Sequence, residues 1–174
     1  MHVMQSHFEL FGLPPAFAVE TDALERSYRE IQSKVHPDRF AHAGDAERRA
    51  SLQWTTRVNE AFQILKNPVK RAKHLLELHG VDVAFETNTQ MPTDFLMRQL
   101  ELREELEAAT GKKDPSRLDR LRADLSLSKR ELEKQIAAAI DGRKDYTGAA
   151  GMVRKLMFLD RLDGEIDLAY EEIE

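Results

Sequence analysis

A histidine and an aspartate flank a proline in the segment KVHPDRF, residues 34–40. His36 and Asp38 are residue types that perform general acid–base catalysis, and histidine also ligates metals. No nucleophilic side chain stands beside them to complete a catalytic site. The further histidines His42, His74 and His79 do not repeat at the one-turn spacing that a metal site on a helix needs. We therefore expect a protein that is not an enzyme, with no metal site and no cofactor.

Pro37 accounts for part of this segment, because a proline disfavours helical backbone in the residue before it. A helix that arrives from upstream therefore ends at His36. In the simplest interpretation, His36 and Asp38 are incidental to that helix end. In the alternative, the proline fixes an exposed bend that presents both side chains to another protein. An aspartate carboxylate accepts hydrogen bonds only and can bind a partner's arginine in bidentate fashion.

Four basic residues lie near this segment along the chain: Arg26, Arg29, Lys34 and Arg39. Together they would form a positive surface that steers an acidic partner and makes the encounter sensitive to salt. Taken alone, such residues describe a solvated helix face. Their position beside the bend is what makes them candidate binding residues.

The helix that positions the bend has an apolar residue at every third or fourth place. This stripe consists of Leu24, Tyr28, Ile31 and Val35. Thr21 or Asp22 can cap the helix, which ends at about residue 35. A longer helix is expected over residues 45–66, and its inner face would hold Trp54, Val58, Ala61, Phe62 and Leu65. A short helix over residues 69–78 follows, and Gly80 closes it.

The composition agrees with helices throughout the chain. Charged residues make up 33% of the 174 residues and hydrophobic residues 41%, while Gly and Pro are few, at 8 and 6. We therefore predict an all-α protein. Cysteine is absent, which excludes disulfides and thiolate metal sites. The sequence contains neither a secretory signal nor a run of about 18 apolar residues, so we expect a cytoplasmic protein without a membrane partner.

The two halves of the chain differ in charge. Residues 1–79 contain 11 Lys and Arg against 10 Asp and Glu, whereas residues 80–174 contain 15 against 21. This difference predicts that the halves meet different partners. Neither half is basic enough for a nucleic-acid binder. We expect a first domain over residues 1–79 and a linker over residues 80–91, which show no helical stripe.

Residues 92–174 are expected to form a second domain. Helical periodicity predicts three helices there, over residues 93–109, 115–141 and 146–173. Their apolar repeat of about 3.5 residues implies near-antiparallel packing. The second domain is therefore predicted to be a three-helix bundle.

The first helix of this bundle carries more apolar residues than one inner face requires. At 100° per residue, Phe95, Leu102 and Leu106 share one face. A second face holds Leu96, Met97 and Leu100, with Glu104 and Glu107 on it and Glu101 at its edge. In the last helix, Phe158 lies roughly 100° from the main apolar stripe. Either a neighbouring helix covers these residues, or they form an exposed binding patch with a carboxylate rim.

Residues 28–40, YREIQSKVHPDRF, followed by a loop and a long helix, resemble the J domain. J-type co-chaperones present this helical hairpin with short flanking helices to the ATPase domain of a DnaK-class chaperone. The resemblance implies that His36, Pro37 and Asp38 switch the ATPase of that chaperone. Glu30 departs from the J-domain pattern, which often continues the basic character at this place. This departure favours a specialised chaperone as the partner.

Two segments of the second half, FLMRQLELREEL and RKLMFLDRL, extend the resemblance to the HscB family of iron–sulfur cluster assembly, as does NPVKRAKHLLELHG at residues 67–80. The resemblance covers nearly the whole chain. It implies that the C-terminal bundle binds the scaffold protein IscU and brings it to the chaperone HscA. The implied scaffold contacts are Leu96, Met97, Leu100, Glu101, Glu104 and Phe158. Ala108 stands where the family's acidic row continues, so the electrostatic share of binding is smaller here or Glu107 substitutes.

Two other functions fit the same residues. One is a J-domain protein that recruits a different client, which a pull-down with candidate scaffolds would separate. The other is a helical adaptor outside the chaperone system, in which the His-Pro-Asp segment is only a helix end. An ATPase assay with a DnaK-class chaperone distinguishes that adaptor from a co-chaperone.

Overall fold

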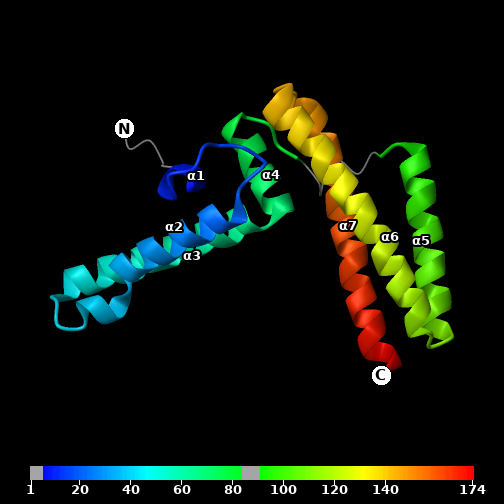
Figure 1. Ribbon diagram of the computed structural model, residues 1–174, viewed down its shortest axis with the longest axis horizontal. Helices are drawn as coiled ribbons and strands as arrows, with labels where there is room; N and C mark the ends of the chain where they lie inside the picture. Colours follow the sequence, from blue (N-terminus) through cyan, green and yellow to red (C-terminus); the bar gives the residue numbers. More distant parts are fainter. Residues whose placement is uncertain (1–5, 84–90) are drawn as a thin grey trace. The chain divides into compact units, whose positions relative to one another are not determined.

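The computed structural model describes residues 6–83 and 91–174, and every regular element within these ranges is a helix or helical turn (Figure 1). The all-α prediction is therefore confirmed. The chain divides into two compact units between Gly80 and Val81, each with its own apolar core. No helix in the described ranges is long and apolar enough to cross a membrane.

The first unit is a helical hairpin with short helices at its base. Its elements are α1 (His7–Leu10), α2 (Thr21–Val35), the 3-10 turn η1 (Pro37–Phe40), α3 (Asp45–Lys66) and α4 (Pro68–Leu78). α2 and α3 lie side by side, with η1 at the end where they are joined and α1 and α4 at the opposite end (Figure 1). The bounds of α3 and the end of α2 agree with the predicted helices.

α3 organises the core of this unit, because it contacts α1, α2, η1 and α4. The largest fully buried side chains are Phe8, Leu24, Val58, Leu65, Leu75 and Leu76. Tyr28 of α2 stacks on Phe62 of α3 with ring centroids 4.0 Å apart, and its hydroxyl donates to Asn59 Oδ1 at 2.7 Å. The apolar ring is thus packed while its polar end keeps a hydrogen bond, which fixes α2 against α3.

Trp54 does not lie on the inner face of α3, where its spacing predicted it. It is 42% exposed, and the guanidinium of Arg57 lies 5.3 Å from its ring centroid. Near the bend, Ser51 and Thr55 face α2 instead, and their hydroxyls donate to the carbonyl of Val35 at 2.5 and 3.2 Å. Two small hydrogen-bonding residues therefore occupy the interface, and the indole lies outside it.

The N-terminus of α2 also differs from the prediction. The N-cap residue is Glu20, so Thr21 and Asp22 lie inside the helix, and no side chain makes a capping hydrogen bond there. Asp22 still stabilises this end, because a carboxylate in the first turn interacts favourably with the helix dipole. At the end of α4 the prediction is confirmed. Gly80 takes the left-handed conformation, with φ at 73°, and its N–H donates to the Glu77 carbonyl at 3.0 Å.

The second unit is a three-helix bundle, as predicted. Its elements are α5 (Thr93–Gly111), α6 (Pro115–Ala137), the π-helical turn η2 (Ala138–Gly142) and α7 (Tyr146–Ile173). Asp114 caps α6 by accepting from the N–H of Ser116 at 3.1 Å, and Asp145 caps α7 by accepting from the N–H of Gly148 at 3.0 Å. The segment predicted as one helix over residues 115–141 changes to a π-helical turn after residue 137.

Leucine and isoleucine side chains from all three helices fill the bundle. The largest fully buried ones are Leu118, Leu125, Ile136, Leu156, Leu162 and Ile166. They recur at intervals of three, four or seven residues or sums of these, which is the pattern that packs long helices together.

Charged side chains join the helices outside this core. Lys129 of α6 contacts Asp160 and Asp163 of α7, at 2.5 and 3.4 Å. Burial by itself lowers the pKa of Lys129, but the hydrogen bonds and attraction of these carboxylates outweigh it and raise the pKa above its usual value. Arg103 Nη1 of α5 donates to both carboxylate oxygens of Glu165 of α7, at 3.0 and 2.9 Å. α7 is thus tied to both neighbours by ion pairs as well as by apolar packing.

The segment predicted as a linker, residues 80–91, is only partly described, because residues 84–90 lie outside the described ranges. Val83 at its start is buried, and its carbonyl accepts a hydrogen bond from Arg154 Nη1 of α7 at 2.9 Å. This contact ties the first residues after Gly80 to the second unit.

Candidate functional site

The His-Pro-Asp segment forms the bend between α2 and η1. His36 ends α2 with extended backbone, at φ −58° and ψ 135°, which is the conformation that Pro37 imposes on the residue before it. Pro37 then begins η1, where its missing N–H costs no hydrogen bond. Sequence alone therefore determines the direction in which the chain leaves α2.

The two polar side chains of the bend are held but open to solvent. His36 Nδ1 accepts a hydrogen bond from the backbone N–H of Asp38 at 3.2 Å and lies 3.5 Å from Asp38 Oδ2. The carboxylate side chain is 93% exposed and the imidazole 46%. A partner can therefore reach the carboxylate without moving any other part of the protein.

Contacts from both sides hold the bend in place. Ser51 and Thr55 of α3 donate to the carbonyl of Val35, the last residue of α2. From within the bend, Arg39 Nη1 donates to the Ser33 carbonyl at 3.1 Å. These bonds satisfy carbonyls that a helix end leaves without intrahelical partners. They make the bend a defined structure even though the side chains of His36 and Asp38 are exposed.

The four basic residues near the bend are all exposed, but they are not equally available. Arg29 is 3.4 Å from Glu25, and Lys34 is 3.3 Å from Glu30, in each case one helical turn away. Glu30, the departure from the J-domain pattern, therefore offsets part of the Lys34 charge. Such exposed pairs are weak, at about 0.3–0.5 kcal/mol, so a stronger acidic partner can replace them.

A second candidate surface lies on the bundle. Leu96, Met97 and Leu100 of α5 are between 46% and 61% exposed, so no neighbouring helix covers the second apolar face. Phe158 of α7 is half-buried, and it meets Phe95 of α5 edge to face with ring centroids 6.3 Å apart. Three large apolar side chains close together on one exposed helix face are typical of an interaction site. We call Leu96, Met97, Leu100 and Phe158 the apolar patch.

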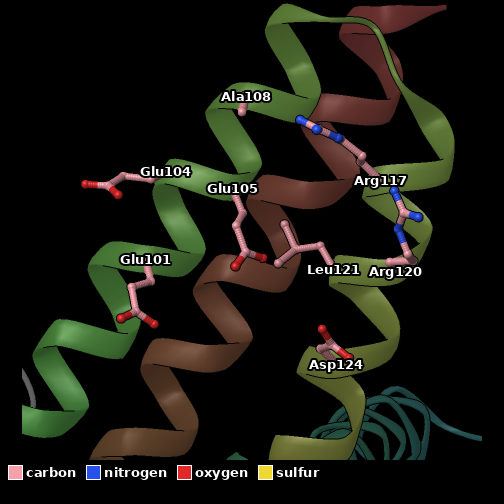
Figure 2. Close-up of a pocket in the computed structure, with 8 residues that line it drawn as sticks. All are labelled: Glu101, Glu104, Glu105, Ala108, Arg117, Arg120, Leu121 and Asp124. Carbon is pink, nitrogen blue, oxygen red and sulfur yellow. The ribbon is translucent and has the colours of Figure 1, made fainter.

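Carboxylates continue from the apolar patch along α5. Glu101 and Glu104 are exposed, and Glu101 pairs with Arg98 at 3.0 Å. Both residues line a groove of about 600 Å³ between α5 and α6, in which Ala108 presents only a methyl group, and Figure 2 shows the Glu104 carboxylate directed away from α6. Glu107 does not border this groove; it lines a separate hollow with Glu165 and Leu168 of α7.

The opposite wall of the groove escaped the sequence prediction. Arg117 and Arg120 of α6 line it, and Figure 2 shows the Arg117 side chain reaching toward α5 while Glu105 points toward Leu121 between the helices. The sequence signal for this wall is only a pair of arginines three residues apart. Which way they face depends on how α6 is rotated against α5, and no periodicity in α5 reveals that rotation.

Within the described ranges, no group of three or more His, Asp or Glu side chains is arranged to hold a metal ion. His7 and His74 do approach each other, with ring centroids 4.4 Å apart, and the half-buried ring of His74 stacks on the buried Phe8. Burial, followed by repulsion from His7, lowers the pKa of His74 to about 4. A neutral imidazole at this place is a packing group and a hydrogen-bond acceptor.

Comparisons with known proteins match the chain over both units. A family model described as the HSCB C-terminal oligomerisation domain matches residues 91–167. A co-chaperone protein HscB homolog from Azoarcus sp. (strain BH72) is 46% identical over 172 residues, which is 99% of this chain and 97% of that protein. The homolog from Burkholderia mallei (strain SAVP1) is 49% identical over 169 residues, 97% of this chain and 96% of that protein.

Solved structures show the same arrangement of helices. The chaperone HscB from Vibrio cholerae superposes with a TM-score of 0.84 at 33% identity, covering 97% of this chain and 99% of that chain. The human co-chaperone protein HscB gives a TM-score of 0.89 at 25% identity, covering 97% of this chain and 83% of that chain. The similarity therefore includes the hairpin with its bend as well as the bundle.

Proposed function

This chain belongs to the HscB family of co-chaperones, and we propose that it stimulates the ATPase of a DnaK- or HscA-class chaperone and delivers the iron–sulfur scaffold protein IscU to it. The first unit, the J domain, would act on the chaperone through His36, Pro37 and Asp38. The second unit would hold the scaffold on the apolar patch and its carboxylate rim. In this proposal, the first unit binds the chaperone and the second unit binds the scaffold.

The exposed carboxylate of Asp38 is the observation that carries this proposal. A carboxylate that is 93% exposed on a bend fixed from both sides has little conformational freedom to lose when it binds. It is also an acceptor-only group, so its natural partner is a guanidinium or a cluster of backbone N–H groups. We infer that the chaperone offers such a donor to Asp38.

The basic residues beside the bend would guide this encounter. Arg26, Arg29, Lys34 and Arg39 are all exposed, and they lie within 12 residues of Asp38 in the sequence. Their attraction for an acidic surface mainly raises the association rate and weakens as salt is added. The pairing of Lys34 with Glu30 reduces this attraction and favours a partner that depends on it less.

The apolar patch supports the proposed role of the second unit. Leu96, Met97 and Leu100 keep apolar surface in water that a bound scaffold would bury, at roughly 25 cal/mol per Å². Glu101 and Glu104 at its edge favour a scaffold with basic residues there. Since Ala108 carries no charge, apolar burial supplies the larger share of the proposed affinity.

Single-turnover ATP hydrolysis by the chaperone, with and without IscU, tests the first half of the proposal. We expect Asp38→Asn to abolish the stimulation, because the neutral amide cannot take a guanidinium as a charged pair. Asp45→Asn is the matched control, since Asp45 is an exposed aspartate at the start of α3, and it should stimulate normally. Full stimulation by Asp38→Asn would refute the proposed role. Loss of helicity in that variant would instead show that Asp38 is structural.

Scaffold binding to the apolar patch is tested by calorimetry with purified IscU. Replacing Leu96, Met97, Leu100 and Phe158 together with alanine should weaken binding at least tenfold, because large apolar side chains at the centre of an interface dominate its affinity. The melting temperature should change little for the three exposed residues of α5. A large fall in melting temperature for the Leu96, Met97 and Leu100 replacements alone would place them in the core and contradict the proposal.

A further inference from the structure

A second cleft lies between α5 and α6, and it shares no residue with the apolar patch or with the groove of Figure 2. It occupies about 460 Å³ beside the N-terminal half of α5, within the range of roughly 300–1,000 Å³ that is typical of ligand sites. α6 diverges from α5 in this direction (Figure 1). Its apolar lining is Phe95, Leu102, Leu127, Leu132 and Leu159. We call this hollow the α5–α6 cleft.

Gln99 lines the same cleft with a side chain that has no hydrogen-bond partner among residues 6–83 and 91–174. It is only 6% exposed, and neither its Nε2 nor its Oε1 reaches solvent or bonds to any of the residues that the structure describes. Burying an amide donor and acceptor without partners destabilises a fold, and native structures contain few such groups. A leucine here would fit the apolar lining at no such cost. The amide therefore indicates a function that needs both its donor and its acceptor.

The charged side chains at the mouth of the cleft nearly balance. Arg98 pairs with Glu101 at 3.0 Å, and the Lys155 ammonium lies 5.6 Å from the ring centroid of Phe95, while Glu131 supplies a negative charge. A balanced rim does not select a strongly anionic or cationic ligand. Ser128 and Gln135 add further hydrogen-bonding groups to the lining, so the cleft favours an uncharged ligand with an apolar body and several amide-like donors and acceptors.

An extended peptide combines these features, since it has apolar side chains and a backbone N–H and C=O in each residue. In an extended strand, the N–H and C=O of one residue point to the same side, so that a facing amide can bond to both. The N–H and C=O of the neighbouring residues point to the opposite side, and the side chains alternate between the two faces, roughly perpendicular to these hydrogen bonds. A leucine-type side chain next to the bonded residue would lie against Phe95, Leu132 and Leu159.

We propose that the α5–α6 cleft binds a short, uncharged, leucine-rich segment of a partner protein in extended conformation, with Gln99 pairing to the N–H and C=O of one of its residues. This site goes beyond the proposed binding of the chaperone and the scaffold, and it uses none of their residues. Since the amide is covered, a ligand must displace side chains that line the cleft, of which Arg98 and Lys155 are long and flexible. Leu127, which is 62% exposed, is the apolar side chain that meets the ligand first.

A blocked peptide of sequence Ser-Leu-Leu-Ser is the probe, titrated into the full-length isotope-labelled protein and followed by NMR. We expect the side-chain amide signals of Gln99, identified by their loss in Gln99→Leu, to shift with a millimolar dissociation constant. The same peptide with both leucine nitrogens methylated lacks the N–H groups and should bind about tenfold more weakly. Gln99→Leu should likewise weaken the parent peptide about tenfold, because two hydrogen bonds are lost. No shift at Gln99 with either peptide overturns the proposal.

The melting temperature of the Gln99→Leu variant tests whether the Gln99 amide stabilises the fold. Gln99→Leu should raise the melting temperature by a few degrees, because it removes buried polar atoms without partners. A lower melting temperature would mean that Gln99 serves the fold, and the proposal would be wrong.

Leu127→Glu and Leu168→Glu form a matched pair for the location of the site. Leu168 of α7 is 63% exposed and lies outside the α5–α6 cleft, so its variant should bind the probe peptide normally. Leu127→Glu should abolish peptide binding. Equal binding by both variants would overturn the proposal. So would a dimer in sedimentation experiments that only Leu127→Glu dissociates, because a second copy of the chain would then occupy the cleft.

Discussion

His36 has a structural role in the bend, and in the proposed function it also takes part in recognition. Its Nδ1 accepts the Asp38 N–H and so caps η1, which in the neutral ring leaves the proton on Nε2, directed away from the backbone. The imidazole therefore orders the bend and presents a donor beside the exposed carboxylate. In the proposed function, the histidine would therefore be more than an incidental residue of a helix end.

His74 makes the stability of the first unit depend on pH. Its pKa is about 4 in the folded protein, lowered from about 6.5 by burial and by His7, and in the neutral form its Nε2 accepts the His7 N–H at 3.4 Å. Between these two values the unfolded chain takes up a proton that the folded chain does not. Stability is therefore full above pH 6.5 and is lost as the pH falls toward 4.

We expect this loss to reach up to about 2 kcal/mol, after allowance for the partial exposure of His74. Urea unfolding of the full chain at pH 7, 5.5 and 4.5 measures it. His74→Phe preserves the packing against Phe8 and removes the titrating group, so its stability should fall less over the same range. Parallel curves for the two proteins would show that other groups cause the loss.

At the scale of elements, a few polar contacts join helix ends and helix faces. These contacts cannot be predicted from the local sequence. Ser51 and Thr55 join the end of α2 to α3, and Lys129 joins α6 to α7. Each contact links residues at least 16 positions apart in sequence. Such contacts also determine which side chains an interface leaves out. Trp54 is an example, because Ser51 and Thr55 face α2 and the indole lies outside the α2–α3 interface.

Replacing Lys129 with methionine tests the energetic weight of the α6–α7 contact. The Lys129 side chain is 22% exposed, and Lys129→Met removes the ammonium shared by Asp160 and Asp163, of which Asp163 keeps its contact with Arg122 at 3.4 Å. We expect a loss of about 1–2 kcal/mol in the free energy of unfolding. Arg98→Met is the control, because its pair with Glu101 is exposed and should cost no more than about 0.5 kcal/mol. Equal losses of unfolding free energy in the two variants would mean that the Lys129 charge contributes little and that its methylene groups, which methionine retains, supply its stabilising contacts.

At the scale of the whole molecule, two compact units with different surface charge share one chain. In the proposed function, each unit binds its partner weakly, and the covalent connection raises the effective concentration of one partner near the other. Affinity therefore need not be high at either the bend or the apolar patch.

Separating the units tests this coupling. Residues 1–80 alone, at high concentration, should still stimulate the chaperone's ATPase, because the bend lies entirely in that unit. Adding residues 81–174 as a separate chain together with IscU should give no further stimulation, whereas the intact chain should. Circular dichroism and melting curves confirm that each piece is folded. An equal response from the mixture and the intact chain would show that the connection is not needed.

Much of this protein follows from short-range pattern in the sequence. Pro37 and a four-residue apolar stripe determine where α2 ends, and leucines at intervals of three and four define the bundle helices within a few residues. The second apolar face of α5 is also visible in the sequence, because a helix has a known periodicity and its inner face is already complete. These features depend on neighbours within two helical turns, and local propensity and periodicity encode them.

Other features depend on tertiary structure alone. The exposure of Trp54, the burial of Gln99 without a partner, and the arginine wall opposite Glu101 depend on how far neighbouring helices diverge and how each is rotated about its axis. Those quantities are set by the sum of many side-chain contacts between residues distant in sequence. A stripe of apolar residues predicts that a neighbouring element will bury that helix face. Which parts of the face stay exposed depends on how the helices pack in the bundle.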